Sequence, residues 1–324
     1  MTGATELRAA VIGVGSFGRH HARILHELGS EGVRLVGLVD LDAEGPRDLA
    51  ERFRVPLVSH VDALPEPVDV VSVAVPTAEH RKVAEPLLER GVHCLVEKPV
   101  AGSRGDAEAL VSAARRGGAV LEVGLVERFN PVRSALDRMG APPAFLEVHR
   151  LAPFARRSTD VGVVMDLMIH DLDLVSHLVG EDASRIDAVG VPVFGPHEDL
   201  ANARITFPSG CVANLTASRA SLQRMRRFRI FSREGYLSLD YDHQKALLVR
   251  PPAEPPSEAS LSALAMEELP IRDTEPLREE LVALVRAVRE GRGPGSGWED
   301  ALRALGLAEQ ILAALHAHPV PRAP

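Results

Sequence analysis

Several features that mark particular protein classes are scarce in this sequence. Its two cysteines, Cys94 and Cys211, lie far apart and without C-x-x-C spacing, which indicates neither a disulfide framework nor a thiolate zinc site. Aromatic side chains make up 4% of the residues, too few for base-stacking platforms. No apolar run approaches the roughly 18 residues that a membrane helix requires.

The charge is slightly negative and evenly spread. There are 37 Lys and Arg against 45 Asp and Glu, a formal charge of −8, with no long block of one sign. This balance disfavours nucleic-acid and polybasic membrane-binding proteins. A short polar lead passes directly into an apolar strand, without the basic region and cleavage site of a signal peptide. We therefore expect a cytoplasmic protein with neither nucleic-acid nor membrane partners.

The length of 324 residues predicts about two domains. Over residues 1–124, short apolar runs alternate with helical patterns, as in βαβ units of a parallel sheet. We predict strands at 7–12, 34–39, 57–58, 68–75, 93–96 and 120–123. We predict helices at 18–28, 46–53, 79–91 and 104–117. The expected fold class is α/β, beginning with a doubly wound Rossmann sheet.

The sequence pattern changes in a second domain, residues 125–324, where longer predicted strands follow one another at the spacing of hairpins. We predict strands at 144–150, 185–193, 201–207, 211–218, 227–232, 235–241 and 245–250. A helix at 164–179 precedes most of them, and helices at 276–290 and 298–317 follow. This order predicts an α+β domain, with the C-terminal helices packing back on the first domain.

A glycine motif follows the first strand and opens the first helix. Gly13 permits a tight turn, Gly15 lets a pyrophosphate approach the main chain, and Gly18 lets helix and strand pack closely. Asp40 ends the second strand, where a carboxylate accepts hydrogen bonds from an adenosine ribose and repels a 2′-phosphate. The motif therefore predicts NAD, with NADP disfavoured. The alternative is a glycine turn beside a surface aspartate.

The tripeptide Glu97-Lys98-Pro99 follows an apolar strand, at the sheet edge where open α/β sheets bind ligands. A lysine there can hold or relay a proton beside a reacting oxygen. In the second domain, Asp166 and His170 are spaced to share one helix face, where a carboxylate orients an imidazole as a general base. Ordinary surface pairs are the alternative for both, with Asp171 and Asp173 as solvated neighbours of the second.

Taken together, these features resemble the Gfo/Idh/MocA oxidoreductases, which include glucose-fructose oxidoreductase and inositol dehydrogenase. The matching features, in order, are the glycine motif, Asp40, Pro76-Thr77 followed by His80, Glu97-Lys98-Pro99, and Asp166 with His170. The resemblance covers essentially the whole chain. It implies a Rossmann domain and a C-terminal domain whose large, open, mostly antiparallel sheet forms a homodimer or homotetramer. It also implies that Lys98 and His170 are the catalytic pair, with Asp166 as their partner.

The resemblance also implies the residues that contact ligands. The expected cofactor-binding residues are Gly13, Gly15, Ser16, Phe17, Gly18, Asp40, Pro76, Thr77, His80, Glu97, Lys98 and Arg128. The expected substrate contacts are Lys98, Arg128, Asp166 and His170, to which the arginine cluster described below adds Arg219 and Arg227. Residues 123–131 and 160–171 look most like a branch that includes UDP-N-acetylglucosamine 3-dehydrogenases. One departure is Val161-Gly162-Val163-Val164, where many relatives carry two or three glycines.

Five arginines crowd one predicted strand and its approach. They are Arg219, Arg224, Arg226, Arg227 and Arg229. Strand alternation places Arg227 and Arg229 on one face, with Phe228 and Ile230 on the other. Such arginines bind a diphosphate or carboxylate through paired hydrogen bonds. The alternative is a solvated strand face or a subunit contact.

The combined prediction is an NAD-dependent dehydrogenase that oxidises a secondary hydroxyl of a sugar or sugar nucleotide. No metal is expected, because hydride transfer to nicotinamide requires only a positioned alcohol and a base. An inositol or aldose dehydrogenase is one alternative, and a reductase acting on the keto compound is another. A third is an NAD-bound sensor without turnover.

Overall fold

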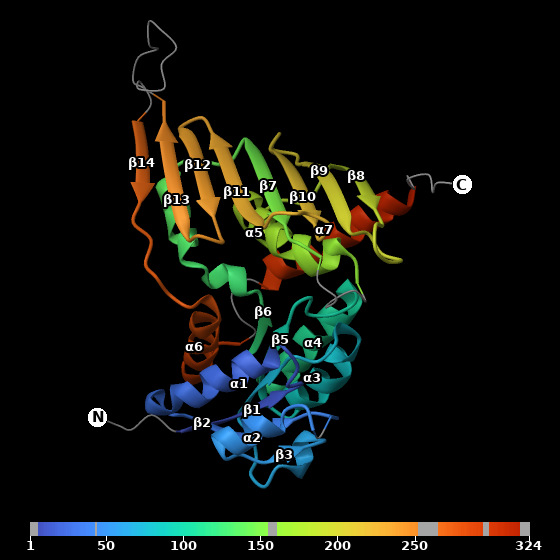
Figure 1. The fold of residues 1–324 in the computed structure, drawn as a ribbon, viewed down its shortest axis with the longest axis vertical. Coiled ribbons are helices and arrows are strands. Elements are labelled where there is room, and N and C mark those ends of the chain that lie inside the picture. The colour runs from blue at the N-terminus through green and yellow to red at the C-terminus, as the bar shows by residue number, and fades with distance from the viewer. Residues whose placement is uncertain (1–5, 43, 155–160, 252–264, 294–297, 318–324) are drawn as a thin grey trace, which may run out of the picture. The chain divides into compact units, whose positions relative to one another are not determined.

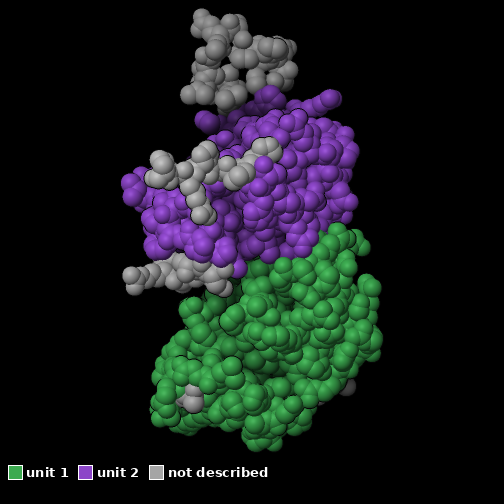
Figure 2. All heavy atoms as spheres, turned by 90° about the vertical axis from the view of Figure 1, so that its right-hand side faces the viewer, with its two compact units in different colours: residues 1–126, 275–302 green, residues 127–274, 303–324 purple. Residues whose placement is uncertain are grey.

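The computed structural model describes residues 6–42, 44–154, 161–251, 265–293 and 298–317. The chain divides into two compact units (Figure 2): Met1–Val126 with Glu275–Leu302, and Glu127–Thr274 with Arg303–Pro324. The boundary expected after residue 124 lies near this division. Residues 275–302, predicted to lie in the second domain, belong to unit 1. The polar lead and Asp160 lie outside the described residues.

Unit 1 contains a six-stranded parallel sheet (Figure 1). Its strands are β1 (Leu7–Ile12), β2 (Val33–Val39), β3 (Leu57–Val58), β4 (Val70–Val73), β5 (His93–Glu97) and β6 (Leu121–Gly124). Its helices are α1 (Gly18–Glu27), α2 (Arg47–Phe53), α3 (His80–Glu89), α4 (Arg104–Gly117) and α6 (Pro276–Arg289). The strand order β3-β2-β1-β4-β5-β6 confirms the predicted Rossmann fold.

The strands of unit 1 are apolar because helices cover both faces of the sheet. Leu25 of α1 and Leu281 of α6 belong to one core with Val11 and Leu38 of the sheet. Since all six strands are parallel, the loops that follow them emerge at one edge. That edge carries the glycine loop after β1, Asp40 after β2, and Lys98 after β5.

Unit 2 contains an eight-stranded sheet in the order β14-β13-β12-β11-β7-β10-β9-β8. Its strands are β7 (Phe145–Leu151), β8 (Arg185–Val191), β9 (Leu200–Thr206), β10 (Val212–Ser218), β11 (Met225–Ser232), β12 (Gly235–Asp240), β13 (Lys245–Arg250) and β14 (Ala265–Leu269). All pairs are antiparallel except β7 with β10. The α+β prediction is confirmed, although it missed β14, a mostly exposed edge strand without alternating hydrophobicity.

Helices cover one face of this sheet (Figure 1). Helix α5 (Ile169–Val179) and the part of α7 (Trp298–Ala317) that belongs to unit 2 share a core with the inward side chains of the strands. Phe228 and Ile230 point into that core, and Arg227 and Arg229 lie on the opposite face, as predicted. Within the described residues, no helix is both long and apolar enough to cross a membrane.

Candidate active site

The glycine loop leaves its main chain open to a ligand at one position. Gly13 has φ 85°, and a Cβ there would lie 2.7 Å from the main chain of Ala74. A Cβ on Gly18 would lie 1.9 Å from the carbonyl oxygen of Gly13. At Gly15, by contrast, a Cβ would enter open space, and Ser16 and Phe17 are exposed. The loop therefore fits a pyrophosphate lying against Gly15 at the start of α1.

Asp40 supports this loop from the end of β2. Its Oδ2 accepts a hydrogen bond from the main-chain N–H of Val14 at 2.7 Å, and its Oδ1 accepts one from Asp42 at 2.9 Å. The carboxylate therefore lies beside the glycine loop, where an adenosine ribose would follow the pyrophosphate. Asp42, Glu44 and Asp48 add negative charge to the same stretch of chain.

The loop after β4 lies on the other side of β1 in the strand order. Pro76 is exposed and Thr77 is half-buried. His80, expected to contact the cofactor, is instead 1% exposed. Its Nδ1 lies 3.0 Å from the carbonyl oxygen of Pro99, and its Nε2 lies 2.9 Å from that of Val75. Burial lowers the pKa of His80, and the carbonyl contacts oppose that shift.

The carboxylate of Glu97 is buried in unit 1, where the residue is 7% exposed. Its Oε1 lies 3.2 Å from Nε2 of the buried His21, and its Oε2 accepts the main-chain N–H of Lys98 at 3.2 Å. A Cβ on Gly124 would lie 2.6 Å from Oε1, so glycine leaves room for this carboxylate. Lys98 itself is half-buried at the carboxyl end of β5.

In unit 2, Asp166 and His170 lie on one continuous helical segment. A π-helical turn (Val164–Met168) leads into α5, so the predicted four-residue spacing crosses the junction of two helix types. Both side chains are half-buried. The carboxylate of Glu198 accepts the N–H of Val164 at 3.2 Å and holds the start of this segment. A Cβ at Gly162 would collide with that carboxylate, which explains the glycine retained there.

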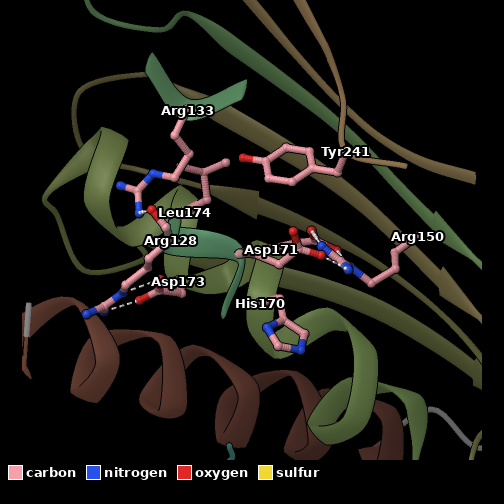
Figure 3. Close-up of a pocket in the computed structure, with 9 residues that line it drawn as sticks. Arg128, Arg133, Arg150, His170, Asp171, Asp173, Leu174 and Tyr241 are labelled. Atoms are coloured by element: carbon pink, nitrogen blue, oxygen red, sulfur yellow. Dashed lines mark hydrogen bonds and ion pairs between the residues drawn. The ribbon is translucent and has the colours of Figure 1, made fainter. Parts of the chain in front are cut away.

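A buried ionic cluster surrounds His170 (Figure 3). Arg150 donates to both oxygens of Asp171 at 2.8 and 2.9 Å and to Glu127 at 2.8 Å. Arg128 forms a bidentate ion pair with Asp173. Burial raises the pKa of Asp171, and the Arg150 guanidinium opposes this shift. The alternative in which Asp171 and Asp173 are solvated neighbours is wrong, because they are 5% and 3% exposed.

These residues line a small cavity together with Arg133, Leu174 and Tyr241, with room for about one water molecule. Sequence reasoning missed Glu127, Arg150 and Tyr241. One signal was available for Arg150. It occupies a core-facing position of β7, in register with Leu146 and Val148, where a charged side chain requires a buried partner. In the described part of the chain, no group of three or more His, Cys, Asp or Glu residues could hold a metal ion.

The arginine cluster is divided between the two faces of the sheet. Arg227 pairs with Asp240 at 3.0 Å on the face opposite α5. It therefore points away from His170, and a shared substrate site is not supported. Arg219 is buried, pairs with Asp199 and donates to the carbonyl of Val161 at 2.9 Å. Its contacts hold the chain just before Asp166, and this packing leaves it no exposed face for a substrate.

Family models match both parts of the chain. The model described as "Oxidoreductase family, NAD-binding Rossmann fold" matches residues 7–125. The model described as "GFO/IDH/MocA C-terminal domain" matches residues 128–238. The chain belongs to the Gfo/Idh/MocA oxidoreductase family. The predicted resemblance is confirmed, and the protein is an oxidoreductase with an NAD-binding Rossmann domain.

Named relatives agree with this membership. UDP-N-acetylglucosamine 3-dehydrogenase from Acidithiobacillus ferrooxidans is 42% identical over 237 residues, covering 73% of this chain and 74% of that protein. A solved structure of that enzyme has a TM-score of 0.88 at 35% identity and covers 96% of this chain and 98% of its own. Levoglucosan dehydrogenase in complex with NADH and levoglucosan has a TM-score of 0.81 at 17% identity, covers 97% and 98%, and shows the shared fold.

Proposed function

We propose that this member of the family is an NAD-dependent dehydrogenase that oxidises a secondary hydroxyl of a sugar nucleotide, with UDP-N-acetylglucosamine as the favoured substrate. The observation that carries this proposal is the 42% identity to a UDP-N-acetylglucosamine 3-dehydrogenase across both domains. The residues expected for the chemistry, Lys98, Asp166 and His170, are all present. The inositol dehydrogenases among the relatives are less similar, as with the 26% identical scyllo-inositol 2-dehydrogenase of Bacillus subtilis.

The cofactor in this proposal is NAD rather than NADP. Gly15 would hold its pyrophosphate, and Asp40 would accept hydrogen bonds from the adenosine ribose diol. A 2′-phosphate there would meet the Asp40 carboxylate, with Asp42 nearby in the chain. Pro76, Thr77 and Lys98, at the ends of β4 and β5, lie at the same edge of the sheet and are the proposed contacts for the nicotinamide half.

Three side chains act on the reacting hydroxyl in this proposal. His170 takes the proton of the reacting hydroxyl, and Asp166 orients the imidazole and stabilises its charged form. Lys98 donates a hydrogen bond to the same oxygen and stabilises its developing negative charge. Bound NAD would supply the hydride acceptor. Arg128, held by Asp173 beside His170, is the proposed charged contact for substrate.

NADH formation tests this function directly. The purified protein would be supplied with NAD and with UDP-N-acetylglucosamine, UDP-glucose, myo-inositol or a free aldose. We expect turnover with UDP-N-acetylglucosamine, reduced about 100-fold or more in kcat by Lys98→Ala, with NAD affinity little changed. Lys82→Ala is the matched control, because Lys82 pairs with Glu79 on an exposed helix face.

The other outcomes of this assay either favour a different dehydrogenase or contradict part of the proposal. Equal turnover of a sugar with and without the UDP group would favour an aldose dehydrogenase, and turnover of myo-inositol alone would favour an inositol dehydrogenase. Tight NAD binding without turnover of any compound would contradict the proposed substrate class. An equal loss of kcat and NAD affinity in Lys98→Ala would contradict a catalytic lysine.

A further inference from the structure

Two buried histidines lie against the turn that carries Lys98. His21 of α1 and His80 at the start of α3 are 0% and 1% exposed. The chemistry proposed above uses neither ring. Both contact the four-residue turn Glu97–Val100, one on each side of Lys98 in the chain.

His80 contacts the part of the turn that follows Lys98. Its Nδ1 lies 3.0 Å from the carbonyl oxygen of Pro99 and 3.3 Å from that of Val100. Its Nε2 lies 2.9 Å from the carbonyl oxygen of Val75, in the loop after β4. Carbonyl oxygens only accept, so a ring nitrogen bonds to one only when it carries the proton, and a neutral ring carries that proton on one nitrogen at a time. His80 thereby links the turn after Lys98 to the loop at the end of the neighbouring strand.

His21 contacts the part of the turn that precedes Lys98. Its Nδ1 lies 2.7 Å from Oγ of Ser72 on β4, which fixes the ring plane. Its Nε2 faces Oε1 of Glu97 at 3.2 Å, and Oε2 of Glu97 accepts the main-chain N–H of Lys98 at 3.2 Å. Close polar contacts therefore run from the sheet interior to the main chain of Lys98, and the His21–Glu97 contact among them is not a hydrogen bond.

We propose that His80, through Nδ1, is a positioning residue for Lys98, and that the Ser72–His21–Glu97 chain supports the same turn from its other side. The turn is held both before and after Lys98, so the direction in which the lysine leaves the main chain is fixed by buried contacts. Such fixed placement is what a group acting on a developing charge requires, because small displacements cost rate. This inference rests on the proposed role of Lys98.

Lysine acetylation tests the placement of Lys98 without any substrate. The chain has three lysines, Lys82, Lys98 and Lys245, so mass spectrometry after brief treatment with acetic anhydride resolves each rate. Lys82 and Lys245 are exposed and serve as internal references. The variants are His80→Asn, whose amide nitrogen can take the place of Nδ1, and His80→Gln, whose amide nitrogen reaches the place of Nε2.

We expect His80→Asn to keep the wild-type rate at Lys98 and His80→Gln to raise it several-fold, at unchanged rates for the two reference lysines. If the wild type is active, His80→Gln should also lower kcat about tenfold with little change in substrate KM, and His80→Asn should keep the wild-type kcat. Equal effects of the two variants, or no effect of either, would overturn the proposal. If neither variant folds, Ser72→Ala tests the support from the Ser72–His21–Glu97 chain: faster acetylation of Lys98 supports that part of the proposal, and an unchanged rate rejects it.

The acetylation experiment and the turnover assay test the two proposals separately. A wild type without turnover on any sugar nucleotide contradicts the proposed function, while the rates still report whether His80 holds the turn. Normal turnover together with unchanged acetylation in His80→Gln contradicts the positioning role and leaves the proposed function standing.

Discussion

At the scale of single residues, the sequence predicted which residues follow the strands of the parallel sheet. It did not predict in which direction their side chains point. Lys98 and Asp40 follow strands of a parallel sheet, so their place at one edge follows from local sequence. His80 and Glu97 belong to the same motifs, yet both point into unit 1. Their directions depend on His21 and on carbonyl groups from other segments, which no spacing rule reveals.

The half-buried position and hydrogen bond of His93 predict how the stability of unit 1 depends on pH. Its Nδ1 accepts the main-chain N–H of Val120 at 2.9 Å, which requires an unprotonated nitrogen. Burial lowers the pKa of His93 from its usual 6.5. The unfolded chain therefore takes up a proton that the folded chain resists, so stability is fully present above about pH 6.5 and falls as the pH drops toward the folded pKa. His80 acts in the same direction.

Urea unfolding at a series of pH values would measure this effect. His93→Asn retains an acceptor for Val120 without a titrating ring, so it should lose less stability than the wild type between pH 7 and pH 5. His316→Asn, at an exposed position of α7, is the control and should follow the wild type. A wild-type midpoint that rises on acidification would contradict the assignment.

At the scale of elements, the segment that carries Asp166 and His170 depends on contacts from the neighbouring sheet. Arg219 donates to the carbonyl of Val161, and Glu198 accepts the N–H groups of Val163 and Val164. The periodicity of the sequence predicted a helix here, and it could not distinguish the π-helical turn from α-helix.

Removing Arg219 should destabilise unit 2. Asp199 is fully buried, and although burial opposes its ionisation, hydrogen bonds from Phe194, Arg219 and Val193 lower its pKa overall. Arg219→Met leaves this charge without its partner, at an expected cost of about 3–5 kcal/mol in unfolding free energy. Arg185→Met removes an exposed ion pair and should cost less than about 1 kcal/mol. Denaturant unfolding measures both, and equal effects would contradict this role for Arg219.

At the scale of the whole molecule, one face of the large sheet carries apolar side chains without a covering helix in the described residues of unit 2. The rings of Phe145, Phe231 and Tyr236 contact one another in tilted pairs across three adjacent strands, and Leu247 and Met266 are 36% and 60% exposed. Such a surface is costly in water unless a partner buries it. We propose that a second copy of the chain covers it.

Light scattering at micromolar concentration should therefore give a dimer or a tetramer. Leu247→Asp places a charge on the proposed interface and should shift the distribution toward smaller species. Leu41→Asp, at an 84% exposed position in unit 1, is the matched control and should leave the assembly unchanged. A monomeric wild type would contradict self-association through this face.

The sequence by itself determined the parallel sheet and the glycine loop with Asp40, and it supplied Lys98, Asp166 and His170 as the proposed catalytic residues. These follow from local periodicity, glycine torsions and residue order, which a short window of the chain contains. Only the tertiary structure decided that Arg150 pairs with Asp171 beside His170, that Arg227 faces away from them, and that Glu97 points inward. Each of these depends on the register and packing of segments distant in sequence, because a buried charge takes its direction from the partner that the fold brings to it.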